Sequence, residues 1–277
     1  MRLSQVGESG LLAELERRGL IVGVEHDAAR LAPDLVVTQD ALVEGVHFRF
    51  DLLTWRELGH RAAAVNLSDL AASGATPEAL VVTLAAPPET PLARVVELYE
   101  GLAEAGVRVV GGDTTASPVL VLSVTALGRS PRVPGRAGAL PGDVLVVTGP
   151  LGAAGAAFRQ ARLARPPDRL EEGRRLAATA HALMDISDGI AVDAARLAAR
   201  SGVRLVVELD RVPLAPGATV ADLGFGEDYE LLAAVPTESG DPVVGRVVEG
   251  DGVELLLNGE PYALVGWEHF RLPGRRL

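Results

Sequence analysis

Residues 64–77 read AVNLSDLAASGATP, and this stretch decides how we interpret the fold. It continues a helix that opens with a capping box, in which Thr54 is the N-cap and Glu57 is the third helical residue. Most residues of the stretch are apolar or small, which predicts a buried helix that carries one carboxylate, Asp69. Burying a carboxylate is costly unless something pairs with it. A bound cation is one such partner, and Asn66 or a nearby arginine is the structural alternative.

Outward from this helix, strands and helices alternate irregularly along the chain. The apolar and β-branched runs predict strands at residues 34–40, 79–86, 107–110, 119–126, 143–148, 203–209, 243–249 and 253–257. Helices are expected at residues 1–19, 54–74, 90–106, 151–164, 170–182 and 189–201. This order predicts a mixed α/β (α+β) fold rather than a clean doubly wound sheet.

Turn signals add local detail. Thr90-Pro91 has the composition of an N-cap followed by the first helical residue. Residues 250–252, Gly-Asp-Gly, are expected to close a hairpin between the last two predicted strands. Asn258-Gly259 is a second hairpin turn signal.

The length of 277 residues suits one large domain or two smaller ones. Residues 129–141 are rich in Pro, Gly and Arg and show no apolar period. We therefore place a domain boundary in this segment, with one domain at residues 1–135 and a second at residues 136–277.

Composition excludes several classes of function. The formal net charge of −11 disfavours nucleic acid as a partner, because phosphate backbones need a basic surface. The chain has neither cysteine nor lysine, which excludes thiolate sites and the lysine-dependent P-loop. No apolar run is long enough for a membrane span and no signal peptide is recognised, so a cytoplasmic protein is expected. An acidic protein can still bind phosphates when metal ions reverse the local charge.

Six aspartates have neighbours that are unusual for surface acids. Most of them end a strand or helix or lie beside Gly, Ser or Thr, and most lack an arginine four residues later. Magnesium prefers oxygen ligands and is commonly held by a few carboxylates together with substrate phosphates. Taken alone, such an aspartate is more often a turn or N-cap residue than a ligand. The six are Asp27, Asp40, Asp69, Asp113, Asp185 and Asp188.

Two of these aspartates lie in fragments suited to phosphate binding. In GGDTT, residues 111–115, the glycines follow a predicted strand and let a ligand approach the backbone closely. An ordinary strand-to-loop turn is the alternative. In DISDG, residues 185–189, Ser187 and the amides that open the next helix favour a phosphate group. The alternative here is a double N-cap.

Three further residues are candidates for contacts with a phosphorylated ligand. His47 follows a glycine and is suited to a phosphate contact, although a lone histidine is more often structural. Arg136 lies in the predicted linker, where it would either bind a phosphate or be solvated. Trp267 is one of two tryptophans and could stack on a flat cationic ring, although a core tryptophan is the commoner case.

Taken in order, four motifs resemble those of the PurM-like superfamily, and the resemblance covers nearly the whole chain. They are AVNLSDLAASGATP (64–77), VVGGDTT (109–115), DISDGI (185–190) and GEDYEL (226–231). The fragments GVHF and GWEHF are similar to those of one branch, the thiamine-monophosphate kinase family. The resemblance implies an N-terminal β-rich domain that forms a homodimer through β-strands, a C-terminal α/β domain and an active site between the two.

The resemblance also implies roles for individual residues. Several magnesium ions would be bound by Asp27, Thr38, Gln39, Asp40, Asp69, Asp113, Asp185 and Asp188. ATP or its metal ions would be contacted by Gly112, Asp113, Arg136 and Ser187. Thiamine monophosphate would be contacted by His47, Glu227 and Trp267.

The chain departs from the family pattern at two motifs. Residues 25–27 read Glu-His-Asp where the family has Gly-Asp-Asp, and residues 38–40 read Thr-Gln-Asp where it has Ser-Thr-Asp. One carboxylate and one hydroxyl are therefore missing. The last aspartate of each motif is retained, so we expect the metal site to persist.

The implied activity is magnesium-dependent transfer of the γ-phosphoryl group of ATP to thiamine monophosphate, which yields thiamine diphosphate. Because the acceptor phosphate is already an anion near neutral pH, no general base and no other catalytic side chain is expected. One alternative is another PurM-like enzyme that uses ATP, of the aminoimidazole-ribonucleotide synthetase type. A second is a non-catalytic protein that binds nucleotide or thiamine phosphate, which the departure at residues 25–27 would favour.

Overall fold

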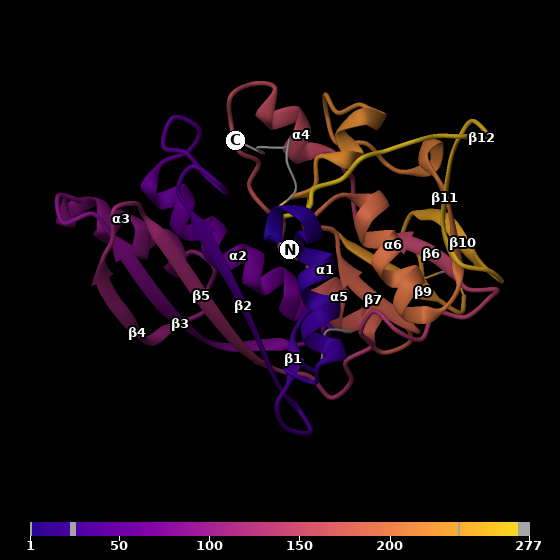
Figure 1. Ribbon diagram of the computed structural model, residues 1–277, viewed down its shortest axis with the longest axis horizontal. Coiled ribbons are helices and arrows are strands. Elements are labelled where there is room, and N and C mark those ends of the chain that lie inside the picture. Colours follow the sequence, from indigo (N-terminus) through magenta and orange to yellow (C-terminus); the bar gives the residue numbers. More distant parts are fainter. Residues whose placement is uncertain (1, 23–25, 238, 271–277) are drawn as a thin grey trace.

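The structure is a computed structural model that describes residues 2–22, 26–237 and 239–270. Its strands form two sheets, and helix α2 contacts both of them (Figure 1). Within the described residues the helices are α1 (Leu3–Arg17), α2 (Trp55–Ala72), α3 (Leu92–Ala103), α4 (Ala153–Phe158), α5 (Leu170–Ala177) and α6 (Ile190–Ser201). None of them combines the length and the apolar character that crossing a bilayer requires.

The first sheet has the strand order β1-β2-β5-β3-β4. Its strands are β1 (Ala29–Arg30), β2 (Leu35–Val43), β3 (Thr76–Ala86), β4 (Val109–Ala116) and β5 (Val121–Arg129). β5 pairs antiparallel with both β2 and β3, whereas β3 and β4 run parallel. Helix α2 packs on one face, which we call the inner face, and α3 packs against α2 (Figure 1). The opposite side is called the outer face.

Helix α2 is fixed at its start by a cap and along its length by a close helix crossing. The predicted capping box is confirmed, since the Thr54 amide donates to Glu57 Oε2 at 2.7 Å and Thr54 Oγ1 accepts from the Glu57 amide at 3.3 Å. A Cβ at Gly59 would lie 1.8 Å from the Leu98 carbonyl oxygen, and one at Gly101 would lie 1.9 Å from a backbone oxygen of α2. Glycine at these two positions therefore allows the backbones of α2 and α3 to touch.

The second sheet has the strand order β12-β11-β8-β10-β6-β9-β7. Its strands are β6 (Val144–Val147), β7 (Ala182–Asp185), β8 (Arg204–Glu208), β9 (Leu231–Val235), β10 (Val243–Val248), β11 (Gly252–Leu257) and β12 (Glu260–Pro261). β8 and β11 run parallel, and the other neighbours are antiparallel.

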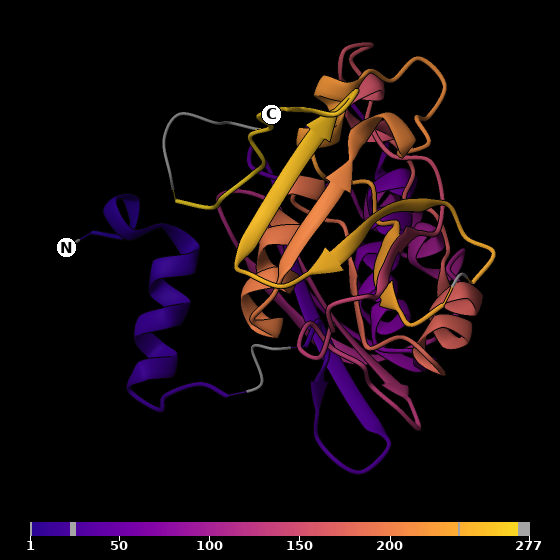
Figure 2. The same ribbon diagram turned by 90° about the vertical axis from the view of Figure 1, so that its right-hand side faces the viewer.

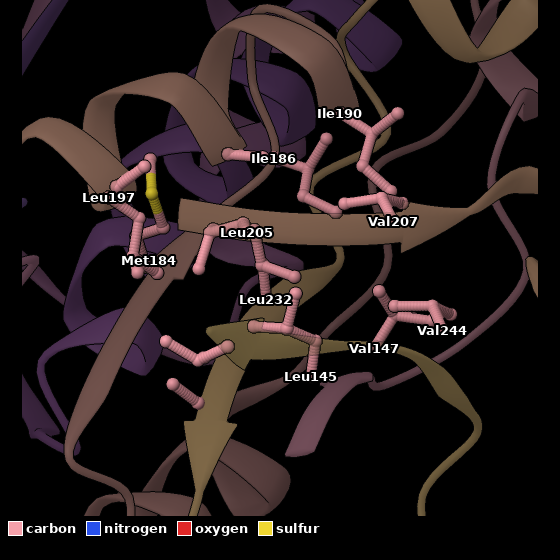
Figure 3. Packing of buried hydrophobic residues seen from close by; sticks show 14 of the residues in the cluster. Leu145, Val147, Met184, Ile186, Ile190, Leu197, Leu205, Val207, Leu232 and Val244 are labelled. Carbon is pink, nitrogen blue, oxygen red and sulfur yellow. The ribbon is translucent and has the colours of Figure 1, made fainter. Parts of the chain in front are cut away.

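Helices cover both faces of the second sheet. On one face Leu145 packs in the same apolar cluster as Ile190 and Leu197 of α6 (Figure 3). On the other face Leu176 of α5 and Ala71 of α2 pack against the sheet. The end of α2 is thus part of the core of the second sheet as well as of the first. The predicted mixed α/β fold is confirmed.

The segment between the sheets is docked on the second one. Arg132 donates to the carbonyl oxygen of Ala180 at 2.7 Å, and the Leu183 amide donates to that of Gly135 at 2.8 Å. The last strand of the first sheet ends before this segment and the first strand of the second begins after it. The position of the domain boundary between residues 135 and 136 stays a prediction.

The predicted hairpin at residues 250–252 is wrong. Strand β8 lies between β10 and β11 and pairs with both, so the two strands flanking this turn are not neighbours. The turn at Asn258-Gly259 is confirmed, because it joins the antiparallel strands β11 and β12. Both residues have positive φ, 53° and 82°, as this kind of tight hairpin requires.

Several predicted boundaries are also wrong. Residues 111–115 lie inside β4 rather than in a loop after it. The helix expected at residues 170–182 is too long, because α5 ends at Ala177, and the short strand β7 that follows was not predicted. Strand β9 was not predicted, and α4 ends at Phe158, well before the expected position. Helix α3 begins after Pro91, which takes the N-cap place that was expected for Thr90.

Helix α1 lies beside the rest of the protein rather than in a core (Figure 2). As predicted, it ends just before Gly19, which has a φ of +68°. The Glu8 amide donates to the His269 carbonyl oxygen at 3.2 Å, and Glu16 forms an ion pair with Arg200 of α6 at 3.0 Å. These polar contacts connect α1 to the half of the chain that carries the second sheet.

Candidate active site

Three carboxylates meet where the two halves of the chain join. Asp27 precedes β1, Asp69 lies in the last turns of α2, and Asp185 ends β7. One oxygen of each lies within 4.8 Å of one oxygen of each of the other two. Burial raises the pKa of Asp69 and of Asp185 well above the ordinary value, and the neighbouring carboxylates raise both further. The cluster therefore crowds carboxyl groups in a place where their negative charge is poorly solvated and where a cation would favour the ionised form.

Hydroxyl groups orient two of these carboxylates. Thr38 Oγ1 on β2 donates to Asp69 Oδ2 at 2.5 Å, and Ser68 Oγ on α2 donates to Asp185 Oδ2 at 2.7 Å. The prediction that Asn66 could pair with Asp69 is wrong. Asn66 instead accepts from the backbone amide of residue 40 and donates to a backbone carbonyl of α2.

The third carboxylate is held by an arginine and leaves one oxygen over. Arg136 Nε donates to Asp27 Oδ1 at 2.9 Å, and Nη2 contacts the same oxygen. Asp27 Oδ2 is buried and has no hydrogen-bond partner within residues 2–22, 26–237 and 239–270. A buried acceptor that lacks a donor is costly unless a cation or water satisfies it. Carboxylate oxygens with this arrangement fit a hard divalent cation such as magnesium.

A second group of charges borders the cluster. Asp40 of β2 faces the same cavity, and its pKa is raised to about 6 by burial and then by the charges of Asp188, Glu8 and Asp27. Asp188 accepts from Arg196 Nη1 at 2.6 Å. The predicted ligands on the inner face of the first sheet and at the end of β7 thus line one cavity of about 310 Å³.

The rings of His47, Tyr229 and His269 line this cavity, whereas Trp267 is not among the described residues that line it. The ring centroids of His47 and His269 lie 5.3 Å apart, and His269 meets Trp267 edge to face at 5.5 Å. His47 Nδ1 accepts from the Val43 amide at 3.0 Å, so a neutral His47 carries its proton on Nε2. The Trp267 amide donates to the Asp188 carbonyl oxygen at 3.0 Å, which ties the rings to the acidic end. His269 was missed from the sequence, although it lies in the quoted fragment GWEHF.

Glu227, whose role as a substrate contact stays a prediction, lines the same cavity and is buried against an arginine that no sequence motif marks. Arg61 of α2 donates to Glu227 Oε2, and both side chains are almost fully buried. No local pattern marks Arg61, because the partner is 166 residues away in the chain.

Asp113 lies apart from the cluster within one chain. It pairs with Thr83 of β3, Thr83 pairs with Ser123 of β5, and Ser123 pairs with Ala41 of β2. Paired residues share a face, so all four lie on the outer face, whereas Asp40 lies on the inner face. Three strand spacings separate β4 from β2, which is about 14 Å.

Two more predicted residues, Gln39 and Gly112, contact other parts of the protein, although Gln39 also borders the cavity of the acidic cluster. The Gln39 side chain extends from the outer face, where it donates to Ser123 Oγ at 2.9 Å and accepts from Thr125 at 3.4 Å. Gly112 borders a separate, open depression beside β4 together with Asp113. Within one chain Gly112 and Asp113 thus lie apart from the acidic cluster, and the roles of these residues as ligands stay predictions. Of the residues at which the chain departs from the family pattern, Glu25 lies outside the described part of the chain.

Comparison with known proteins places the whole chain in one group. The family models for the N-terminal and C-terminal domains of AIR synthase related proteins match residues 25–130 and 141–258. The thiamine-monophosphate kinase of Mycobacterium tuberculosis is 33% identical over 98% of this chain and 94% of its own length. The thiamine-monophosphate kinase of Aquifex aeolicus is 32% identical over 98% of this chain and its full length.

A solved structure agrees with the sequence relatives. AaThiL complexed with AMPPCP and TMP superimposes with a TM-score of 0.87 at 30% identity, covering 97% of this chain and 99% of that one. The two-domain PurM-like arrangement that was expected from the motifs is thereby confirmed.

Proposed function

This chain belongs to the thiamine-monophosphate kinase family, and we propose that it transfers the γ-phosphoryl group of ATP to the phosphate of thiamine monophosphate. The observation that carries the proposal is the junction of a buried acidic cluster and an aromatic wall in one cavity. An acidic cluster suits the metal-bound phosphates of a nucleotide, and a wall of rings suits a flat cationic acceptor. The relative solved with AMPPCP and TMP supports the same pair of ligands.

The acidic cluster would hold several magnesium ions, with Asp27, Asp69 and Asp185 as ligands and Asp40 and Asp188 beside them. When bound, such ions neutralise the charge that develops during phosphoryl transfer and align the reacting groups. The chain itself prepares the site through fixed hydrogen bonds to two of these carboxylates. Charge-assisted bonds of this kind hold a carboxylate in one orientation.

Arg136 and Ser187 are proposed as ATP contacts. Arg136 lines the cavity while it is bonded to Asp27, so its remaining donors can reach an anion beside the cluster. Ser187 lines the cavity two residues after Asp185. On the acceptor side His47, Glu227 and Trp267 are proposed to contact thiamine monophosphate.

No side chain is needed as a general base, because the attacking group is a phosphate that is anionic near neutral pH. We therefore propose direct in-line transfer without a phosphorylated enzyme. A phosphorylated protein intermediate that is trapped in a single turnover and passes its phosphate to thiamine monophosphate would contradict this part of the proposal.

We also propose that the enzyme is a cytoplasmic homodimer that assembles through the outer face of the first sheet. Gly112 and Asp113 are expected ATP contacts, yet Asp113 lies on the outer face about three strands from the acidic cluster. A second copy packed on this face would offer these residues a route to a site that their own chain does not give them.

The test is ATP consumption by the purified full chain with magnesium, comparing thiamine monophosphate, free thiamine and no acceptor. Thiamine diphosphate formed only from thiamine monophosphate is the expected result. ATP binding without turnover would instead favour a non-catalytic binding protein. ATP use that requires neither thiamine compound would favour an enzyme of the aminoimidazole-ribonucleotide synthetase type.

A further inference from the structure

Residues 226–229 form a tight loop whose backbone is unusual. Glu227 and Tyr229 have φ values of 61° and 53°, a region that residues other than glycine rarely adopt. Such conformations are unfavourable and persist only where the surroundings hold them. The Glu227 amide donates to the Ser187 carbonyl oxygen at 2.7 Å, and the Tyr229 amide donates to that of Ile186 at 2.9 Å. The loop is thus bonded to the segment that carries the site aspartates of the second half.

One side chain from the other half of the protein holds this loop. Arg61 of α2 donates to Glu227 Oε2 and also, from Nη1, to the Ala164 carbonyl oxygen at 2.9 Å. Its guanidinium lies 5.9 Å from the centre of the Tyr229 ring. Arg61 is 3% exposed, and it is not among the described residues that line the cavity of the acidic cluster. An arginine placed so deeply requires a strong reason, because desolvating it is costly.

The same helix contacts the second half at a further point. Ser68, seven residues after Arg61, donates to Asp185, and Asp69 follows directly in the cluster. Two helical turns separate the two points of contact, which is about 11 Å along the helix axis. Helix α2 therefore fixes the distance between the loop that carries Glu227 and the carboxylates that would bind metal.

We propose that Arg61 is a positioning residue for the acceptor side of the site. It acts through Glu227, whose carboxylate it keeps at the cavity wall, and it keeps the 226–229 loop in its left-handed conformation. The inference rests on the proposed function, since Glu227 is taken to contact thiamine monophosphate. The pair joins the two halves of the chain, so it sets how far the acceptor lies from the phosphate end of the cavity.

The experiment measures steady-state kinetics of Arg61→Met and Arg61→Lys. Arg61→Met keeps an apolar stem but removes the charge. We expect the KM for thiamine monophosphate to rise on the order of 10- to 100-fold, because even a small displacement of a group that contacts the substrate strongly weakens the contact. The KM for ATP should change by less than about twofold. Arg61→Lys, which keeps the charge but loses the planar fork that bonds to two partners, should recover only part of the loss and leave the KM several-fold above that of the wild type.

A double mutant tests whether Arg61 acts through Glu227. In a Glu227→Gln background, adding Arg61→Met should raise the KM for thiamine monophosphate by less than about twofold, since coupled residues are not additive. Independent effects that multiply would overturn the inference. The matched control is Arg175→Met, which breaks the ion pair with Asp241 away from the cavity and should leave both KM values unchanged.

A structural role alone would lower the melting temperature of Arg61→Met without changing the KM for thiamine monophosphate, and that result would also overturn the inference. If Arg61→Met does not fold, Arg61→Lys carries the test, and a KM equal to that of the wild type overturns the proposal. Calorimetric binding of thiamine monophosphate separates this inference from the proposed function. A wild type that does not turn over contradicts the function, whereas unchanged binding by the Arg61 variants contradicts the role of Arg61.

Discussion

Both faces of the first sheet carry polar and acidic side chains, but those on the inner face meet the buried acidic cluster and those on the outer face lie at the surface. On the inner face Thr38 and Asp40 point toward α2, and Thr38 bonds to Asp69 of the acidic cluster. On the outer face Gln39 bonds to hydroxyls of the neighbouring strand, and Asp113 is exposed. Residues 38 and 39 are neighbours in the sequence, yet the alternation of a strand sends one to the cavity and the other to the opposite surface.

Burial explains why a carboxylate on the inner face indicates a bound cation, whereas one on the outer face does not. An exposed carboxylate is solvated by water, so its presence implies no ligand. Carboxylates that crowd together away from water raise one another's pKa, as they do at Asp69 and Asp185, and a cation relieves the repulsion. The inner face is therefore a candidate site on physical grounds, whereas the outer face needs a second chain before its aspartate has a role.

The largest effect is expected on the inner face, for Asp185→Asn. The substitution keeps the size of the side chain but removes a charge from the cluster, so kcat/KM should fall by about 10³-fold, or about 4 kcal/mol. Without magnesium the same variant should be more stable than the wild type in urea unfolding, because repulsion within the cluster is reduced. Activity within about tenfold of the wild type would contradict a metal role for the cluster.

A second buried acid, Asp228, should behave differently because the protein itself supplies its donors. Its carboxylate accepts from the Gly152 amide at 2.9 Å at the start of α4. Burial raises its pKa to about 6, so the folded protein binds the proton more tightly than the unfolded chain does. Its contribution to stability is therefore full below about pH 4 and is lost as the pH rises through 6.

Asp228→Asn removes this pH dependence. The difference in unfolding free energy between the wild type and the variant should change by up to about 3 kcal/mol between pH 4 and pH 7, to the disadvantage of the wild type at the higher pH. Urea unfolding at four pH values measures it, and effects of other groups cancel in the difference. Curves that run parallel would mean that Asp228 titrates normally.

Local sequence patterns predicted the parts of the site that depend on one element. The apolar surroundings of Asp69 in α2 already required a partner for its charge, and the capping box set the start of that helix. The motif DISDG placed Asp185 and Asp188 together at the end of one segment. In each case the physical signal, a charge in an apolar or glycine-rich context, lies within a few residues.

What could not be predicted depends on pairing between distant segments. Strand β8 separates β10 from β11, so a turn between two adjacent apolar runs did not indicate a hairpin. The face on which Asp113 lies follows from the register of four strands, and register is a long-range property. No local pattern distinguishes Arg61 from other helix residues, because its partner Glu227 comes from the other half of the chain.

A smaller effect is expected for Asp113→Asn on the outer face, and it tests whether two chains share a site. In the proposed homodimer the KM for ATP should rise about tenfold, or about 1.4 kcal/mol, while the KM for thiamine monophosphate is unchanged. Ultracentrifugation should show a dimer for both proteins. A monomeric wild type, or a variant with unchanged kinetics, would leave the outer face without a catalytic connection.

The smallest effects should come from the adjacent pair Thr38 and Gln39, which compares the two faces directly. Thr38→Val removes the hydroxyl that bonds to Asp69 but keeps the shape of the side chain, so losing one hydrogen bond of about 1 kcal/mol should weaken magnesium activation about fivefold. Gln39→Ala breaks two bonds on the outer face and should change magnesium activation by less than about twofold. Titrating magnesium in the kinase assay measures both. Equal effects of the two substitutions on magnesium activation would contradict this comparison. A side chain that faces away from the acidic cluster would then matter as much as one that bonds to it.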